Sequence, residues 1–164
     1  MAAERAVTAD DDRRVALCVA RFYADLADLL EEGARDALLE AGVTAIDKFE
    51  VPGAFELPLI ARYAADTGRY DAIVALGTVI RGETDHYDYV CGEAARGIQQ
   101  VQLLTGVPIG FGVLTVDTVE QARARVKGGG KRDTGRHAVA AALASLAVKR
   151  ELSERPRRAG FAVS

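Results

Sequence analysis

Short apolar runs alternate with helix-like segments along most of this chain, and this alternation restricts the fold more than any other feature. Runs with the length and composition of buried strands lie at residues 14–20, 44–51, 71–80 and 107–116. The run at 71–80, DAIVALGTVI, is the most apolar and is expected to be a central strand. Strands that alternate with helices form parallel units with right-handed crossovers. The pattern therefore predicts an α/β fold, a three-layer α/β/α sandwich around a four-stranded parallel sheet.

Helical periodicity fills the intervals between these runs. In residues 25–41, apolar side chains recur every three or four positions, and Gly42 is the expected stop. Further helices are predicted at 54–65 and 86–105, from Asp117 as N-cap to near Val126, and at 136–150 after a glycine-rich basic loop at 127–135. We therefore expect a flavodoxin-like strand order and one domain at 14–150, between flexible tails at 1–13 and 151–164.

The composition is that of a soluble globular protein. The chain has 164 residues, 49% of them hydrophobic and 27% charged. A net charge of −3 argues against a nucleic-acid partner, and no apolar run approaches the ~18 residues that a membrane span needs. The first residues do not resemble a signal peptide, so we expect a cytoplasmic protein with reduced cysteines. Cys18 and Cys91 have no metal-ligand spacing, so a structural metal site is not expected.

Ligands of such folds bind at the carboxyl ends of the strands, next to helix N-termini. This rule selects residues 21–22, 52–56, 78–86 and 115–117. The loop RGETDH at 81–86 combines a glycine with the start of a helix, a setting that suits a phosphate. His86 ends this loop, and histidine can exchange protons near neutral pH. A capped turn with a solvated imidazole is the other interpretation, and the loop alone does not decide between them.

Other residues at the strand ends have weaker individual signals. Glu56 can accept hydrogen bonds from ligand hydroxyls, or it can simply complement a helix dipole at the surface. Phe22 can stack on a planar heterocycle, although an aromatic at a strand end is more often part of the core. Arg125 can pair with a phosphate, although most basic residues are simply solvated. We expect His137 to be structural and Cys91 to be a buried helix residue.

Four segments taken in order resemble the 6,7-dimethyl-8-ribityllumazine synthases of riboflavin biosynthesis. They read RFYADLADLLEEGARDALLEAGV, VPGAFELP, ALGTVIRGETDHYDYVCGEAARGIQQV and PIGFGVLTVDTVEQARARV. The resemblance covers residues 14–150, and GTVIRGETDHYDYVC is its most specific block. It implies the flavodoxin-like sandwich and a transferase that works without a metal or redox cofactor. The implied reaction condenses 5-amino-6-(D-ribitylamino)uracil with 3,4-dihydroxy-2-butanone 4-phosphate to give 6,7-dimethyl-8-ribityllumazine, the penultimate step of riboflavin biosynthesis.

The resemblance also implies a role for each matching residue. His86 is the acid/base, Phe22 stacks on the pyrimidine, and Arg125 grips the phosphate from a neighbouring subunit of a homopentamer, which in some members assembles into larger shells. The implied substrate-binding residues are Phe22, Ala54, Phe55 and Glu56 around the pyrimidine and ribityl chain, Thr78, Val79 and Ile80 on the uracil, Glu83 and Thr84 on the phosphate through the loop backbone, and Phe111 and Arg125 from the neighbour.

Two features depart from the family pattern. Glu83 brings a negative charge to the phosphate loop, where many members have a small residue. The stretch KGGGKRDTGRH leaves the roles of Lys131, Arg132, Asp133 and Thr134 open, and with them the assembly beyond a pentamer, whether a decamer or an icosahedral shell. The alternative function is a non-catalytic lumazine- or flavin-binding shell protein on the same fold. A generic FMN-binding protein is disfavoured, because no strand-end loop is rich in serine and threonine.

Overall fold

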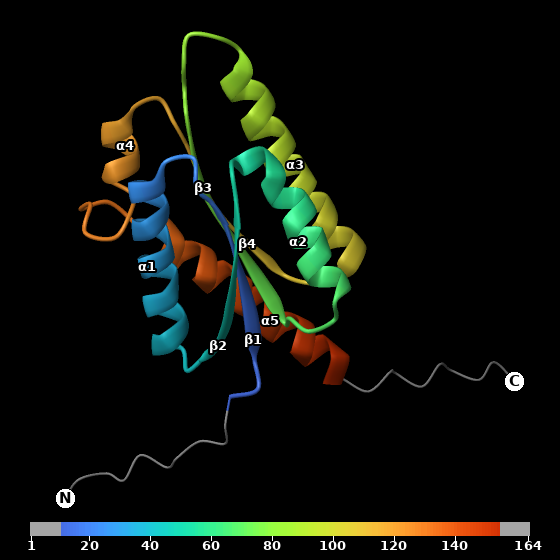
Figure 1. Ribbon diagram of the computed structural model, residues 1–164. Coiled ribbons are helices and arrows are strands. Elements are labelled where there is room, and N and C mark those ends of the chain that lie inside the picture. Colours follow the sequence, from blue (N-terminus) through green and yellow to red (C-terminus); the bar gives the residue numbers. More distant parts are fainter. Residues whose placement is uncertain (1–10, 155–164) are drawn as a thin grey trace, which may run out of the picture.

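A four-stranded parallel sheet lies between two layers of helices in the computed structural model, which describes residues 11–154 (Figure 1). The strands are β1 (Arg14–Ala20), β2 (Ala45–Val51), β3 (Ala72–Ile80) and β4 (Ile109–Val116). They lie in the order β2-β1-β3-β4, and every pair is parallel. The predicted three-layer sandwich with flavodoxin-like order is therefore confirmed.

The helices divide between the two faces of this sheet. They are α1 (Ala24–Glu40), the short 3₁₀ turn η1 (Ala54–Glu56), α2 (Leu57–Asp66), α3 (His86–Thr105), α4 (Val119–Arg123) and α5 (Thr134–Glu154). Helices α1 and α5 cover one face, and α2 and α3 cover the other (Figure 1). Because both faces are covered, β3 is apolar along almost its whole length, as predicted for a central strand.

Each face of the sheet has its own hydrophobic cluster, because successive side chains on a strand point in opposite directions. Val74 and Leu76 of β3 pack with Leu30 and Leu38 of α1 in the first cluster. Ile73 and Ala75, from the same strand, belong to the second cluster with residues of α2 and α3. The two helical layers are thus fixed to one sheet, which sets the positions of the loops at its carboxyl end.

Helix α5 lies directly against the backbone of β4. A Cβ atom added to Gly110 would lie 2.1 Å from the carbonyl oxygen of Ala138, far inside van der Waals contact. Gly110 therefore permits a helix-to-strand approach that no larger residue would allow.

Three helix boundaries differ from the prediction. Thr118, and not Asp117, is the N-cap of α4: its hydroxyl accepts a hydrogen bond from the Gln121 N–H at 3.2 Å, and the helix ends at Arg123. The segment predicted as one helix at 54–65 begins with the η1 turn, and α2 follows. The last helix starts at Thr134 and continues past Arg150 to Glu154.

The predicted flexible tails at 1–13 and 151–164 lie largely outside the described residues. Within residues 11–154, no helix is both long enough and apolar enough to cross a bilayer.

Candidate active site

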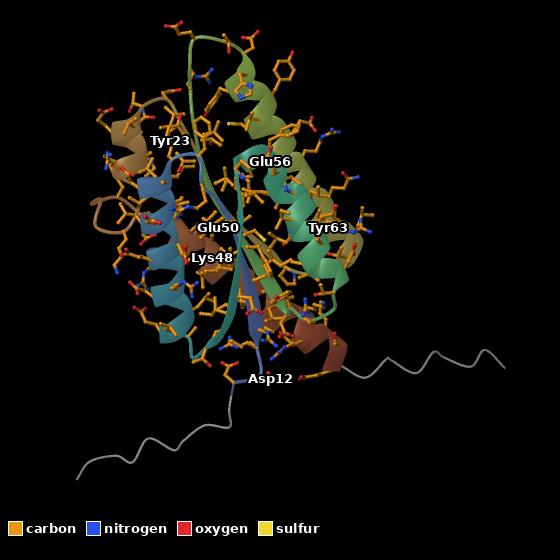
Figure 2. The ribbon with its side chains drawn as sticks, in the orientation of Figure 1. Asp12, Tyr23, Lys48, Glu50, Glu56 and Tyr63 are labelled. Carbon is orange, nitrogen blue, oxygen red and sulfur yellow. The ribbon has the colours of Figure 1, made fainter. Side chains whose placement is uncertain are left out.

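A cleft opens at the carboxyl end of the sheet, where β1, β2 and β3 lead into helices. Its volume is about 560 Å³, in the range of ~300–1,000 Å³ typical of small-molecule sites. It is lined by the β1–α1 turn, by the segment from Pro52 to Glu56, and by the end of β3 with the loop and first turn of α3 that follow it. Tyr23 and Glu56, labelled in Figure 2, mark the first two of these segments.

Most of the predicted site residues meet in this cleft. They are Phe22, Ala54, Phe55, Glu56, Thr78, Val79, Ile80, Thr84 and His86. Pro52, Gly53 and Gly82 also line it and lie in the segments that the strand-end rule selected, without individual roles; the lining residues that were not predicted at all are Tyr23, Tyr87, Tyr89 and Val90. Helical spacing could have found Tyr89 and Val90, which lie three and four positions after His86 and so share its side of α3.

Phe22 stands in the turn between β1 and α1 and is 74% exposed. Its ring meets the Tyr23 ring edge to face, with the centroids 5.0 Å apart. The expectation that an aromatic at a strand end belongs to the core does not hold here, because Phe22 presents its ring to the cleft. An exposed, edge-supported ring is suited to stacking on a planar ligand.

Glu56 lies in the η1 turn that follows β2. Its Oε2 accepts a hydrogen bond of 3.0 Å from the Gly53 N–H, which fixes the carboxylate over the turn. An ionised carboxylate has several lone pairs on two oxygens, so it can accept from a ligand hydroxyl as well. Glu56 thus caps the η1 turn and also lines the cleft, so it is more than the dipole-complementing surface residue that was the alternative.

His86 is the first residue of α3 and is exposed at the cleft. The loop before it is short, and the hydroxyl of Thr84 accepts from the His86 N–H at 3.4 Å. The first N–H groups of a helix have no intrahelical acceptor and lie at the positive end of its dipole. The geometry thus places an imidazole beside a backbone suited to an oxyanion.

Tyr87 and Cys91 follow His86 on α3. Burial raises the pKa of the Tyr87 hydroxyl and of the Cys91 thiol, so both groups are neutral near pH 7. Cys91 is half-buried and not fully buried as predicted. Burial also raises the pKa of Cys18 in β1 to about 12, and both cysteines are free thiols. Neither thiol has the lowered pKa of a nucleophilic cysteine.

Thr78 carries an unpaired hydroxyl just below the cleft. Its Oγ1 is buried and has no hydrogen-bond partner among the described residues. Leu76 and Ile80 pack with the α1 and α5 cluster, and Thr78 shares their face of β3. Its side chain is therefore directed into that layer, although the residue itself is part of the cleft lining.

Three predicted residues do not line the cleft of this chain. Phe111 is the third residue of β4, about 16 Å along the strand from its carboxyl end at ~3.3 Å per residue. Arg125 follows α4, and its Nη1 donates to the Gln121 carbonyl at 2.9 Å. Glu83 is exposed, and only its neighbours Gly82 and Thr84 are part of the lining.

The basic loop before α5 is anchored by its own contacts. The Oδ1 of Asp133 accepts from the Arg136 N–H at 3.1 Å and so caps α5, which assigns a role that the sequence left open. Lys127 pairs with Asp36 at 2.7 Å and with Glu32 at 3.6 Å, both on α1. His137 is exposed on α5 and lies outside the cleft.

The described part of the chain holds no group of three or more His, Cys, Asp or Glu side chains arranged to bind a metal ion.

The fold and the cleft define a doubly wound α/β protein with a small-molecule site at the carboxyl edge of its sheet. The sequence model of the 6,7-dimethyl-8-ribityllumazine synthase family matches residues 12–150. The chain therefore belongs to this family.

Curated relatives agree with the match. The 6,7-dimethyl-8-ribityllumazine synthase of Kineococcus radiotolerans is 51% identical over 146 residues, which cover 88% of this chain and 89% of the relative. The enzyme of the same name from Streptomyces coelicolor is 50% identical over 145 residues, covering 87% and 89%. That of Deinococcus radiodurans is 53% identical over 124 residues, covering 73% and 80%.

Proposed function

We propose that this chain is a lumazine synthase that condenses 5-amino-6-(D-ribitylamino)uracil with 3,4-dihydroxy-2-butanone 4-phosphate in the cleft described above. Membership of the family supports the activity. The observation that carries the assignment of the site is the meeting of Phe22, Glu56 and His86, from three different strand ends, in one cleft. The transferase product is 6,7-dimethyl-8-ribityllumazine.

The uracil substrate occupies the side of the cleft formed by β1 and η1. Phe22 stacks on its pyrimidine ring, and the ribityl chain runs along Ala54 and Phe55 with a hydroxyl donated to Glu56. Thr78, Val79 and Ile80 contact the uracil from the end of β3, mainly through their backbone.

The phosphate of the second substrate lies at the loop before α3. The N–H groups of residues 83 and 84 and the N-terminus of α3 supply the donors. The exposure of the Glu83 side chain supports this role, because its charge then faces solvent while its backbone N–H stays available.

The chemistry consists of proton transfers and the holding of two substrates in register. One amine attacks the carbonyl and forms an imine with loss of water. Elimination of phosphate then gives an enol that tautomerises to a ketone, and the second amine attacks this ketone and closes the ring with loss of a second water. His86 donates and accepts the protons of these steps from its place beside the phosphate loop. No net oxidation or reduction takes place, so the proposed reaction needs no redox cofactor.

The functional unit is a homo-oligomer, a pentamer or an assembly of pentamers, in which a neighbouring copy contributes Phe111 and Arg125. Its support is an exposed apolar stripe on η1 and α2 formed by Phe55, Leu59 and Tyr63, four positions apart, which are 58%, 53% and 60% exposed. Tyr63 projects from the outer side of α2 in Figure 2. A stripe of this kind is typical of a protein interface. The free thiols of Cys18 and Cys91 support action in the reducing cytoplasm.

Mixing the two substrates with the purified protein tests the function. We expect lumazine absorbance to appear far faster than in the uncatalysed reaction, with release of inorganic phosphate. Tight lumazine binding without turnover would instead identify a non-catalytic binding protein.

A further inference from the structure

Two inner strands of the sheet end in the same way. Arg21 directly follows β1 and Arg81 directly follows β3. The Arg21 N–H donates to the carbonyl of Val51, the last residue of β2, at 2.9 Å. The Arg81 N–H donates to the carbonyl of Val116, the last residue of β4, also at 2.9 Å. Each arginine therefore extends the ladder by one bond to the outer strand beside it.

The side chain of Arg81 joins this outer strand to the start of α3. Its Nε donates to Asp117 Oδ1 at 2.9 Å, just after β4, and its Nη1 lies 3.6 Å from Asp88 Oδ1 in the first turn of α3. The guanidinium also lies over the ring of Tyr87, 4.2 Å from its centroid. His86, the first residue of α3, lies along the chain between Arg81 and the two α3 residues that Arg81 contacts.

The side chain of Arg21 makes the equivalent connection on the other wall. Its Nη1 donates to Asp28 Oδ1 of α1 at 2.5 Å, and its Nε lies 3.9 Å from Glu50 Oε1 near the end of β2. These contacts tie α1 to the outer strand across the turn that holds Phe22. Neither Arg21 nor Arg81 lines the cleft.

We propose that Arg21 and Arg81 are positioning residues that fix the two walls of the cleft relative to each other. Arg21 fixes the turn that holds Phe22, and Arg81 fixes the loop and the start of α3 that hold His86. The inference rests on the proposed function, and it assigns each arginine to a different substrate. Arg21 serves the stacking of the uracil, and Arg81 serves the phosphate loop and proton transfer.

The strength of the ion pairs alone does not explain these residues, because exposed pairs add little to stability. Geometry is what they affect: a misplacement of about 1 Å at a reacting group can lower a rate by up to ~10²-fold. Hydrogen bonds to Asp28 and Asp117 raise the pKa of Arg21 and of Arg81 respectively, so both guanidinium groups stay charged.

Steady-state kinetics with each substrate varied in turn test the proposal on the purified full-length protein. Arg81→Gln should lower kcat by about tenfold and raise KM for the phosphate substrate, with KM for the uracil changed less than about twofold. Arg21→Gln should raise KM for the uracil by about fivefold, with kcat within about twofold. The control is Arg136→Gln, which removes an exposed pair between α5 and Glu40 of α1 and should leave every constant unchanged.

Double variants supply a readout that a merely structural role would not produce. In a His86→Ala background, Arg81→Gln should have less than about twofold further effect on kcat, because it acts through the imidazole that is already absent. In a Phe22→Ala background, Arg21→Gln should likewise leave KM for the uracil almost unchanged. Full additivity in both backgrounds would overturn the inference.

Milder variants keep the proposal testable if Arg81→Gln does not fold. If Arg81→Gln does not fold by circular dichroism, Arg81→Lys, which keeps the charge but loses the planar fork, and Asp117→Asn take its place with the same expected pattern. Variants indistinguishable from Arg136→Gln would refute the positioning role while the function stands. An inactive wild-type protein would refute the function itself, so the two failures are distinguishable.

Discussion

The two helical layers differ in how they meet solvent. Outward-facing side chains of α1 and α5 form ion pairs, such as the pair of Arg136 and Glu40 at 2.6 Å and those of Lys127 with Asp36 and Glu32. On the other face, η1 and α2 expose the stripe of Phe55, Leu59 and Tyr63. Helix α3 has 20 residues, and its buried ones are Ala94, Ile98 and Val101.

We propose from this contrast that the layer of α1 and α5 is complete within a single chain and that the layer of α2 and α3 is not. In α1, the buried residues form one apolar stripe, and charged residues occupy the opposite side. In α2, Leu59 and Tyr63 are exposed beside the ion pair of Arg62 and Asp66, and exposed apolar side chains cost solubility unless another surface covers them. The cleft lies at the end of this layer, where we propose that a neighbouring copy contributes to it.

The largest expected effect comes from a comparison of the two histidines of the chain. His86 begins α3 in one layer, and His137 lies in the first turn of α5 in the other. His86→Ala should lower kcat by about 10²–10⁴-fold, the usual contribution of an acid/base group. His137→Ala, on the exposed side of α5, should change it less than twofold. Kinetics of the two purified variants measure this, and a loss below tenfold for His86→Ala would show that another group carries the proton.

Core truncation in the complete layer should lower stability rather than chemistry. Leu30 of α1 is fully buried against the sheet, and Leu30→Ala should lower the free energy of unfolding by about 2–5 kcal/mol. The exposed Leu39→Ala on the same helix should cost less than about 0.5 kcal/mol. Urea unfolding followed by circular dichroism compares the two, and equal costs would contradict the described packing of α1.

Placing a lysine on the exposed face of α2, with a matched lysine on α1 as the control, tests whether α2 forms a subunit interface. Leu59→Lys on α2 should reduce the mass of the native particle and lower activity by about tenfold or more, because Arg125 then no longer reaches a neighbouring cleft. Leu39→Lys on α1, at similar exposure, should leave both unchanged. Native mass spectrometry and activity assays provide the measurements; an intact, active Leu59→Lys particle would remove α2 from the interface.

The smallest expected effect concerns the buried hydroxyl of Thr78, which has no hydrogen-bond partner among residues 11–154. Thr78→Val replaces the unpaired buried hydroxyl with a methyl group of similar shape, so it should raise the free energy of unfolding by about 1 kcal/mol. Thermal and urea unfolding measure this gain. A loss of stability would mean that the hydroxyl has a partner in the assembled protein.

The fold could be predicted because its signals are repeated along the chain. The apolar content of β3 follows directly from burial on both faces, and the period of α1 follows from burial on one. Helix starts were harder, since Asp117 and Thr118 are both good caps by residue type and only the backbone decides between them. The same applies to Asp133, whose capping role depends on how the preceding glycine-rich loop folds.

The site was predictable in its segments but not in all its residues. The strand-end rule located Phe22, Glu56 and His86, because it depends on topology alone. Tyr23 was missed because its place in the lining depends on the direction of one turn. The roles of Phe111 and Arg125 stay predictions, because a contribution across subunits cannot be read from the geometry of one chain.

The close approach of Gly110 to Ala138 limits how this part of the molecule can change. Gly135 brings α5 equally close to α1, because a Cβ atom there would lie 2.2 Å from the carbonyl oxygen of Leu30. Where Gly110 meets Ala138, main-chain atoms contact main-chain atoms, so the substitution of a side chain cannot adjust the spacing. Any side chain at residue 110 would push α5 away from β4. The exposed residues of α5 can therefore vary in evolution while the position of the helix against the sheet is preserved.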